Sequence, residues 1–169
     1  MKKQKGFSLI ELLIVVAIIL IIAAIAIPNL LKAKMAANES SAAGAIRTIN
    51  TAQVSYSTLF PQVGYAATLQ ALGGTAVGCA PPTPSTVANA CLVDELISGY
   101  GAPAFVKSGY TFGMGPGNVL GPPLVTYFVT ATPVSIGTSG QNMFCSDQSG
   151  VVRHNLTGAG CGPTSLALQ

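Results

Sequence analysis

The sequence predicts an α+β protein, in which a long N-terminal helix packs against a small antiparallel sheet of three or four strands. Three observations support this class: a charge-free apolar segment near the N-terminus, an apolar stripe at helical spacing after it, and β-rich runs towards the C-terminus. The first half of the helix is expected to be apolar all round and the second half amphipathic. One face of the sheet must then cover the apolar stripe.

The apolar segment runs from Leu12 to Leu31, between Glu11 and Lys32, and its twenty residues carry no charge. At about 1.5 Å rise per residue, a helix of this length matches a hydrocarbon core of about 30 Å. The segment can therefore span a bilayer. Its composition accounts for much of the 50% hydrophobic and only 8% charged residues of the whole chain.

A secretory signal is the alternative interpretation of this segment, with Ala24-Ile25-Ala26 as a small-x-small cleavage site. Glu11 argues against it, because a charge is unwelcome early in the apolar region of a signal peptide. The apolar stretch also exceeds the usual length of about 7 to 15 residues. A membrane anchor is therefore favoured, although the lysines on its two flanks give only a weak orientation bias.

The helix is expected to extend from Phe7 to about Leu59. Pro28 removes one backbone donor and crowds the carbonyl of Ala24, which predicts a kink or local loosening there. The helical pattern then resumes and ends before Phe60-Pro61, because a residue before proline is pushed out of the α region. The apolar stripe of the second half consists of Ala42, Ile46, Ile49, Gln53, Tyr56 and Phe60.

Residues 61–123 are rich in Gly, Pro, Ala, Ser and Thr, which predicts an ordered loop. One short helix is expected in it near Leu92 to Ile97, because Asp94 and Glu95 would fall in the first turn of that helix. Strands are expected at residues 110–112, 124–132, 142–146 and 151–153. Asp147 to Gly150 forms a hairpin turn between the last two. The sheet core is expected to include Tyr110, Phe112, Tyr127, Phe128 and Phe144.

Four cysteines, Cys79, Cys91, Cys145 and Cys161, all follow the membrane segment, and their even number fits disulfides in an oxidising compartment. None belongs to a C-x-x-C motif and the chain has a single histidine, which disfavours a zinc site. Three pairings are formally open. Pairing between sequence neighbours is preferred, because each bond would close one loop rich in Gly and Pro, worth about 3 kcal/mol.

The charge distribution gives no support for nucleic-acid binding. Of eight basic residues, Lys2, Lys3 and Lys5 lie in the N-terminal tail, and the other five balance five acidic residues without forming a cluster. No nucleic-acid partner is therefore predicted.

No enzyme activity, cofactor or metal is predicted either. His154 and Asp147 do not indicate a catalytic triad, since the sequence has no nucleophile elbow and a lone histidine at a strand end is more often a surface residue. The run "GMGPGN", residues 113–118, lacks the ending of a phosphate loop and is interpreted as a flexible turn. Asp94, Glu95 and Asp147 are too sparse for the six to eight oxygen ligands that calcium prefers.

The segment "GFSLIELLIVVAIILIIAAIAIP", residues 6–28, resembles the class III signal of type IV pilins and type II secretion pseudopilins. The short basic leader, Gly6, Phe7, Glu11 and Pro28 all occur in register with that signal. The resemblance implies cleavage between Gly6 and Phe7, N-methylation of Phe7, and assembly roles for Glu11 and Pro28. It divides the chain into a leader, residues 1–6, a transmembrane and filament-core helix, residues 7–31, and a periplasmic or extracellular globular domain, residues 32–169.

Glu11 also needs a partner on physical grounds. A charged side chain within hydrocarbon costs about 2.5 to 3.5 kcal/mol on insertion scales, and no Lys or Arg is near it after cleavage. The freed amine of Phe7 is positive with or without a methyl group. It can pair with Glu11 of its own chain or with Glu11 of a neighbouring copy, and the second arrangement would fix the axial register of a polymer.

The resemblance implies a structural pilus subunit, made as an inner-membrane prepilin with a cytoplasmic N-terminus and assembled with identical copies into a helical filament on the cell surface. The implied partners are a prepilin peptidase and methyltransferase, an inner-membrane assembly platform with a separate assembly ATPase, and membrane lipid before assembly. Two alternatives stay open: a pseudopilin of a type II secretion system, and a membrane-anchored periplasmic binding domain that never polymerises.

Overall fold

The computed structural model describes residues 8–74, 79, 85–99, 105–117, 121–155, 160–162 and 164–168. The chain divides into two compact units, Met1–Lys34 and Met35–Gln169. The first contains the apolar segment, and the second contains the sheet and all four cysteines.

The long N-terminal helix is confirmed as α1, Leu9–Leu59, with 51 residues. It ends immediately before Phe60-Pro61, as the preference of a residue preceding proline requires. Phe7, its expected first residue, lies outside the described part of the chain. The helix continues through Pro28, and the kink expected there stays a prediction.

Within the described residues, the sheet contains six antiparallel strands, each paired with its neighbour in sequence, so the expected number of three or four is wrong. The strands are β1 (Val106–Lys107), β2 (Tyr110–Pro116), β3 (Tyr127–Pro133), β4 (Met143–Asp147), β5 (Arg153–Asn155) and β6 (Leu166–Ala167). Three of the inner strands, β2 to β4, correspond to β-rich runs, whereas β5 shares only Arg153 with the run expected at residues 151–153. The two additional strands have two residues each and lie at the edges, where so short a strand leaves no alternating pattern in the sequence.

Of two turns expected around the sheet, one is wrong and one is confirmed. Residues 113–116 are not a flexible turn, because they extend β2 and pair with residues 127–130 of β3. The turn expected at Asp147 to Gly150 is present: the Gly150 amide donates to the Asp147 carbonyl at 2.9 Å, and Gly150 has φ of 73°.

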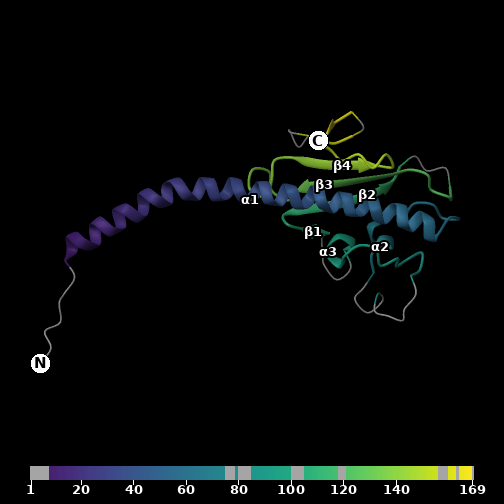
Figure 1. Ribbon diagram of the computed structural model, residues 1–169, viewed down its shortest axis with the longest axis horizontal. Helices are drawn as coiled ribbons and strands as arrows, with labels where there is room; N and C mark the ends of the chain where they lie inside the picture. Colours follow the sequence, from purple (N-terminus) through teal and green to yellow (C-terminus); the bar gives the residue numbers. More distant parts are fainter. Residues whose placement is uncertain are drawn as a thin grey trace, which may run out of the picture. The chain divides into compact units, whose positions relative to one another are not determined.

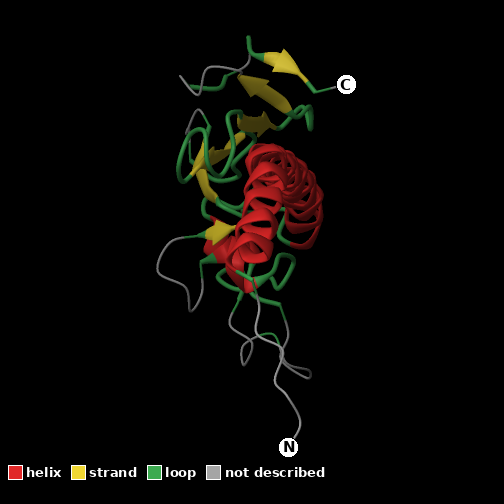
Figure 2. Ribbon diagram, turned by 90° about the vertical axis from the view of Figure 1, so that its left-hand side faces the viewer, coloured by secondary structure: helices red, strands yellow, loops and turns green. Residues whose placement is uncertain are grey.

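The second half of α1 covers one face of the sheet (Figures 1 and 2). The stripe expected from its sequence is buried from Ala42 to Tyr56, and Phe60 packs partly buried against the same core. Four of the five expected aromatics are buried with it. Phe128 is only half-buried, because it follows the buried Tyr127 on β3 and adjacent strand residues point to opposite faces.

In the described part of the segment that joins α1 to the sheet, the chain forms two short helices. The first, α2 (Leu69–Leu72), was not expected, since four residues are too few to show periodicity. The second, α3 (Glu95–Ser98), begins later than expected, and Asp94 is its N-cap rather than part of its first turn. The Asp94 Oδ1 accepts a hydrogen bond from the Ile97 amide at 2.9 Å.

Candidate functional site

The first candidate site is the exposed apolar surface of α1 in the N-terminal unit. Between Leu9 and Leu31 every large aliphatic side chain is exposed, from 40% at Leu31 to 80% at Leu9. By length and composition this helix can cross a membrane, and it is the one candidate span among the described residues. Exposure of this surface to water would be unfavourable by about 25 cal/mol per Å². It therefore needs lipid or other protein chains around it.

Glu11 is the one charged residue between Ser8 and Leu31, and it contacts the start of its own helix. The Ser8 amide donates to Glu11 Oε2 at 2.9 Å. The spacing Ser-x-x-Glu is that of a capping box, in which the glutamate reaches back to the amide of the N-cap residue. In the single chain the Glu11 carboxylate thus satisfies one backbone donor of the helix. The expected processing residues, Gly6 and Phe7, lie outside the described part of the chain.

Pro28 occupies an interior position of α1, where its ring nitrogen has no proton to donate to Ala24. The Ile25 carbonyl, close to the proline, accepts a hydrogen bond from the Asn29 side-chain Nδ2 at 3.1 Å. The Ile25 carbonyl, which adjoins the Ala24 carbonyl that loses its usual donor at the proline, therefore has a side-chain partner within the helix.

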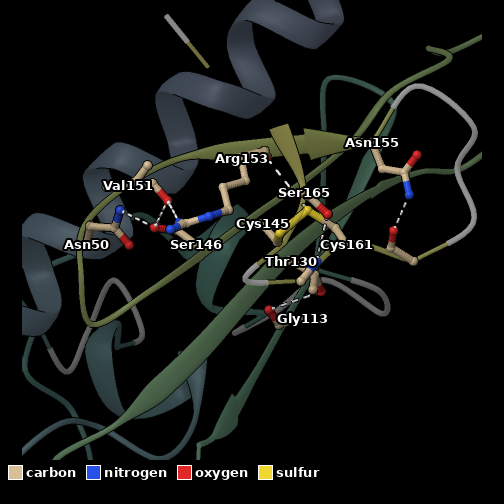
Figure 3. Close-up of a disulfide and its surroundings, with 12 residues drawn as sticks. Asn50, Gly113, Thr130, Cys145, Ser146, Val151, Arg153, Asn155, Cys161 and Ser165 are labelled. Carbon is tan, nitrogen blue, oxygen red and sulfur yellow. Dashed lines mark hydrogen bonds between the residues drawn. A yellow bond between two sulfur atoms is a disulfide. The ribbon is translucent and has the colours of Figure 1, made fainter. Parts of the chain in front are cut away.

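In the globular unit, two buried polar side chains fasten α1 to its surroundings. Asn50 Nδ2 donates to Ser146 Oγ at 2.8 Å, and Ser146 Oγ donates to the Val151 carbonyl at 2.9 Å (Figure 3). The Tyr127 hydroxyl donates to Asn50 Oδ1 at 3.1 Å. Asn50 thereby connects α1 to β3 and to the hairpin between β4 and β5.

Gln53 is fully buried within the apolar stripe and pairs with the backbone of Ala66 through both amide atoms. Its Nε2 donates to the Ala66 carbonyl at 3.0 Å, and its Oε1 accepts from the Ala66 amide at 2.8 Å. A loop backbone buried against a helix needs such partners, because unpaired amide groups are costly away from water.

Glu39 is a contact that the sequence analysis missed. Its carboxylate accepts hydrogen bonds from the Gln141 amide at 2.8 Å, the Asn142 amide at 3.1 Å and Asn142 Nδ2 at 2.8 Å. The adjacent Asn38 donates through Nδ2 to the Ser139 carbonyl at 2.8 Å. Together they hold the loop between β3 and β4 against α1.

Several ionisable groups of this unit have shifted pKa values. Burial, with smaller contributions from Tyr65 and Asp147, raises the pKa of Tyr127 to about 12. Burial disfavours ionisation of Asp94, but hydrogen bonds from Lys107 and the Ile97 amide outweigh it, so the pKa of Asp94 lies below its usual value. The Lys107 Nζ to Asp94 Oδ2 distance is 2.6 Å.

The disulfides join Cys79 to Cys91 and Cys145 to Cys161. Of the three arrangements that were formally open, this is the one between sequence neighbours. The second bond fastens β4 to the segment that follows β5 (Figure 3).

The residues considered in the sequence as catalytic or metal-binding candidates do not form a common site. His154 lies on β5 and faces Phe144 across the strand pair, while Asp94 is engaged with Lys107. Asp147 Oδ1 accepts from the Ser149 amide at 2.8 Å within its own turn. Among the described residues, no three His, Cys, Asp or Glu side chains are grouped to hold a metal ion.

The sequence also matches known proteins. Residues 1–27 match the family model described as the prokaryotic N-terminal methylation motif. The type IV wide pilus major component PilA4 of Thermus thermophilus is 62% identical over 40 residues, which is 24% of this chain and 30% of that protein. The type IV major pilin protein PilA of Myxococcus xanthus is 50% identical over 54 residues, 32% of this chain and 24% of that protein.

These matches support the prediction that the chain is a member of the type IV pilin family. The chain spans less than a third of the length of either relative, so the likeness covers a limited segment. No solved structure matches. An apolar N-terminal helix and pilin relatives fit a membrane-anchored subunit.

Proposed function

We propose that this chain is the structural subunit of a type IV pilus filament. It is made as an inner-membrane prepilin, cleaved after Gly6, methylated at Phe7 and polymerised through its N-terminal helix. The observation that carries the proposal is the exposed, charge-free surface of α1 from Leu12 to Leu31, which follows Glu11 and lies mostly within the matched methylation motif, residues 1–27. Such a surface can be covered either by lipid or by the same surface of other copies.

Glu11 gives this polymer its register. In the single chain its carboxylate accepts from the Ser8 amide, which neutralises no charge. The amine of Phe7 from an incoming copy would supply the positive charge. A buried ion pair is better attested as a determinant of alignment than as a source of net stability, so its main contribution is specificity.

The proposal assigns three functional parts to the chain: the leader, residues 1–6, the filament-core helix, residues 7–31, and the outer globular domain, residues 32–169. Pro28 lets the helix loosen where copies pack. A prepilin peptidase and methyltransferase and an inner-membrane platform with its own ATPase act on the chain, which has a cytoplasmic N-terminus and a single membrane pass before assembly. Assembly energy comes from that ATPase, since the sequence has no nucleotide-binding motif.

The decisive experiment is Glu11→Ala in the full-length protein, expressed in a cell that assembles the wild-type chain. We expect the variant to stay in the membrane fraction, since it makes the segment more apolar, but to yield few or no sheared surface filaments. Glu11→Asp is the matched control, because it keeps the charge and shortens the side chain by one methylene. Normal filaments from Glu11→Ala would contradict the pairing.

Processing is tested separately with Gly6→Glu. We expect this variant to accumulate as uncut precursor, which intact-mass spectrometry distinguishes from a mature chain that begins at a methylated Phe7. A Gly6→Glu variant that retains the mature mass would contradict cleavage of this chain by a prepilin peptidase.

The pseudopilin alternative is not favoured, since both relatives are named as pilus or pilin proteins. Purified surface filaments that contain this chain would separate the two functions. A binding domain that never polymerises predicts no crosslink between a cysteine placed near Phe7 and one placed near Glu11 of another copy.

A further inference from the structure

A groove of about 440 Å³ lies between the second half of α1 and the strands β4 and β5. It is lined on the α1 side by Glu39, Ser40 and Arg47, and on the sheet side by Phe144, His154 and Leu168. Pockets for small ligands are typically about 300 to 1,000 Å³ and combine an apolar surface with a few polar groups. Phe144 and Leu168 supply the apolar surface here, so the polar groups decide what the groove can bind.

Two polar contacts show how β4 lies along α1. Asn142, just before β4, donates to Glu39, whereas Ser146, near the end of β4, is bonded to Asn50. The strand therefore runs beside the helix and in the same direction (Figure 1). Phe144 is halfway between these two contacts, so it lies level with the part of α1 between Glu39 and Asn50.

His154 occupies the middle of the groove and has an unpaired nitrogen. It lies directly opposite Phe144 in the β4–β5 pair, so both side chains are on the face of the sheet that α1 covers. Its Nδ1 is buried and has no hydrogen-bond partner among the residues that the structure describes. Since buried polar atoms are nearly always paired, we expect the contents of the groove to supply the partner.

The two ends of the groove carry opposite charges. Arg47, at one end, is exposed and forms no ion pair with any described residue. Glu39, at the other end, accepts two amide hydrogen bonds on Oε1 and one on Oε2, so Oε2 can accept one more. Eight positions separate the two residues on α1, which is about 12 Å along the helix axis.

These features together define the chemistry of a ligand. It needs an anionic group for Arg47, a donor that is preferably positive for Glu39, a polar group about halfway for His154, and an apolar body. An extended peptide has all four, because it carries a carboxylate, an amine, backbone amides and side chains. At about 3.3 to 3.6 Å per residue, three or four residues span the distance between the charged ends.

We propose that this groove binds a free peptide of three or four residues with apolar side chains. Its C-terminal carboxylate pairs with the Arg47 guanidinium, and its N-terminal amine donates to Glu39. A central peptide group pairs with His154 Nδ1, and the side chains contact Phe144 and Leu168. The site belongs to the globular unit alone, so the inference goes beyond the proposed function and does not require that the chain polymerise.

The first test uses trivaline and its capped forms, titrated by calorimetry into the full-length protein in detergent. We expect a Kd of about 1 mM or tighter for trivaline. Acetylation of the amine or amidation of the carboxylate should each weaken binding about fivefold, because each removes one exposed ion pair. Divaline, which is too short to reach both ends, should bind about as weakly as a capped form.

Two results of this titration would overturn the proposal. One is the absence of binding at about 10 mM trivaline, which is about ten times the expected Kd. The other is equal binding of trivaline that is capped at both ends, since such a peptide imitates an internal segment of a protein and has no charged end to recognise.

The second test places the peptide in the groove. Arg47→Gln should weaken trivaline about fivefold but leave trivaline amide unchanged, a difference that a merely structural role of Arg47 would not produce. Ser40→Leu fills the groove from α1 and should abolish binding. Thr58→Leu is the matched control, because Thr58 is also an exposed hydroxyl residue of α1 but lies outside the groove.

Wild-type affinity in Ser40→Leu, or equal weakening of both peptides by Arg47→Gln, would overturn this site. The thermal midpoint of each variant should match the wild type, which separates binding from folding. Filament formation is tested by Glu11→Ala, so failure of the peptide site and failure of the proposed function are distinguished.

Discussion

Gln53→Glu tests how α1 is fastened to the loop that follows it. The substitution keeps the shape of a fully buried side chain but replaces the Nε2 group that donates to the Ala66 carbonyl. When protonated, the introduced carboxyl group can donate in its place while its other oxygen still accepts from the Ala66 amide. When ionised, it puts a charge into the core and faces a carbonyl oxygen.

The expected loss of folding free energy follows from the burial of residue 53. Burial raises the pKa of a carboxyl group by up to about 3 to 5 units, and we expect about 2 to 3 here because one amide donor remains. At about 1.36 kcal/mol per unit, ionisation then costs about 3 to 4 kcal/mol of folding free energy. Because the pKa is raised on folding, stability is complete below about pH 4.3 and is lost as the pH rises through the raised value.

Thermal unfolding of the detergent-solubilised protein, followed by circular dichroism, measures this loss. At about 2 to 4 °C per kcal/mol, the variant should melt about 6 to 16 °C below the wild type at pH 8, and close to it at pH 4. Gln53→Met is the control: it leaves both Ala66 groups unpaired, so its deficit should not depend on pH. If Gln53→Glu lowered the melting temperature equally at both pH values, the pairing of Gln53 with the Ala66 backbone would be refuted.

Two further predictions concern the same unit. Because burial raises the pKa of Tyr127 from 10.0 to about 12, ionisation of Tyr127 should remove about 2 to 3 kcal/mol of stability between pH 10 and 12. Burial also raises the pKa values of Tyr56 and Tyr110, so Tyr127→Phe should show a smaller alkaline loss than the wild type in denaturant titrations rather than none. If the free energy of unfolding of Tyr127→Phe fell with rising pH as steeply as that of the wild type, the loss would not come from Tyr127. Replacing Cys145 and Cys161 together by serine should lower the free energy of unfolding by about 3 kcal/mol or more, since their bond closes a loop with a separation of 16 residues. Unchanged stability of that double variant, with mass spectrometry confirming the bond in the wild type, would contradict the role given to the disulfide.

The parts of the fold that could be predicted are those with repeated local signals. The 3.6-residue spacing from Ala42 to Tyr56 identified the buried face of α1, and β2, β3 and β4 each left a β-rich run. Gln53 within that stripe was a signal of a buried amide pair, because a polar side chain in a core needs a partner. The edge strands and α2 were missed because two to four residues give no period to recognise.

Glu39 could not have been placed from its sequence context. A carboxylate in the middle of a helix is most often solvated, whereas this one accepts amides about a hundred residues away, with a sequence separation of 102 for Gln141. Only the packing of α1 against the sheet brings the loop of Asn142 to it. Long-range polar contacts of this kind depend on the fold, so they become visible only after it is known.

The N-terminal unit presents the opposite case, because its function is more evident from sequence than from its contacts. An exposed apolar helix near the N-terminus passes the same test of hydropathy as a signal sequence, an anchor or a filament core, although its length already disfavours a signal peptide. Glu11 separates these interpretations. In a signal peptide or a simple anchor, a carboxylate at this place only costs insertion energy, and Ser8 offers an uncharged amide in return. In the polymer that we propose, whose mature chains would begin at Phe7, the Glu11 carboxylate would meet the positive chain end of a neighbouring copy, so a residue that is unfavourable in one copy would determine the alignment of many.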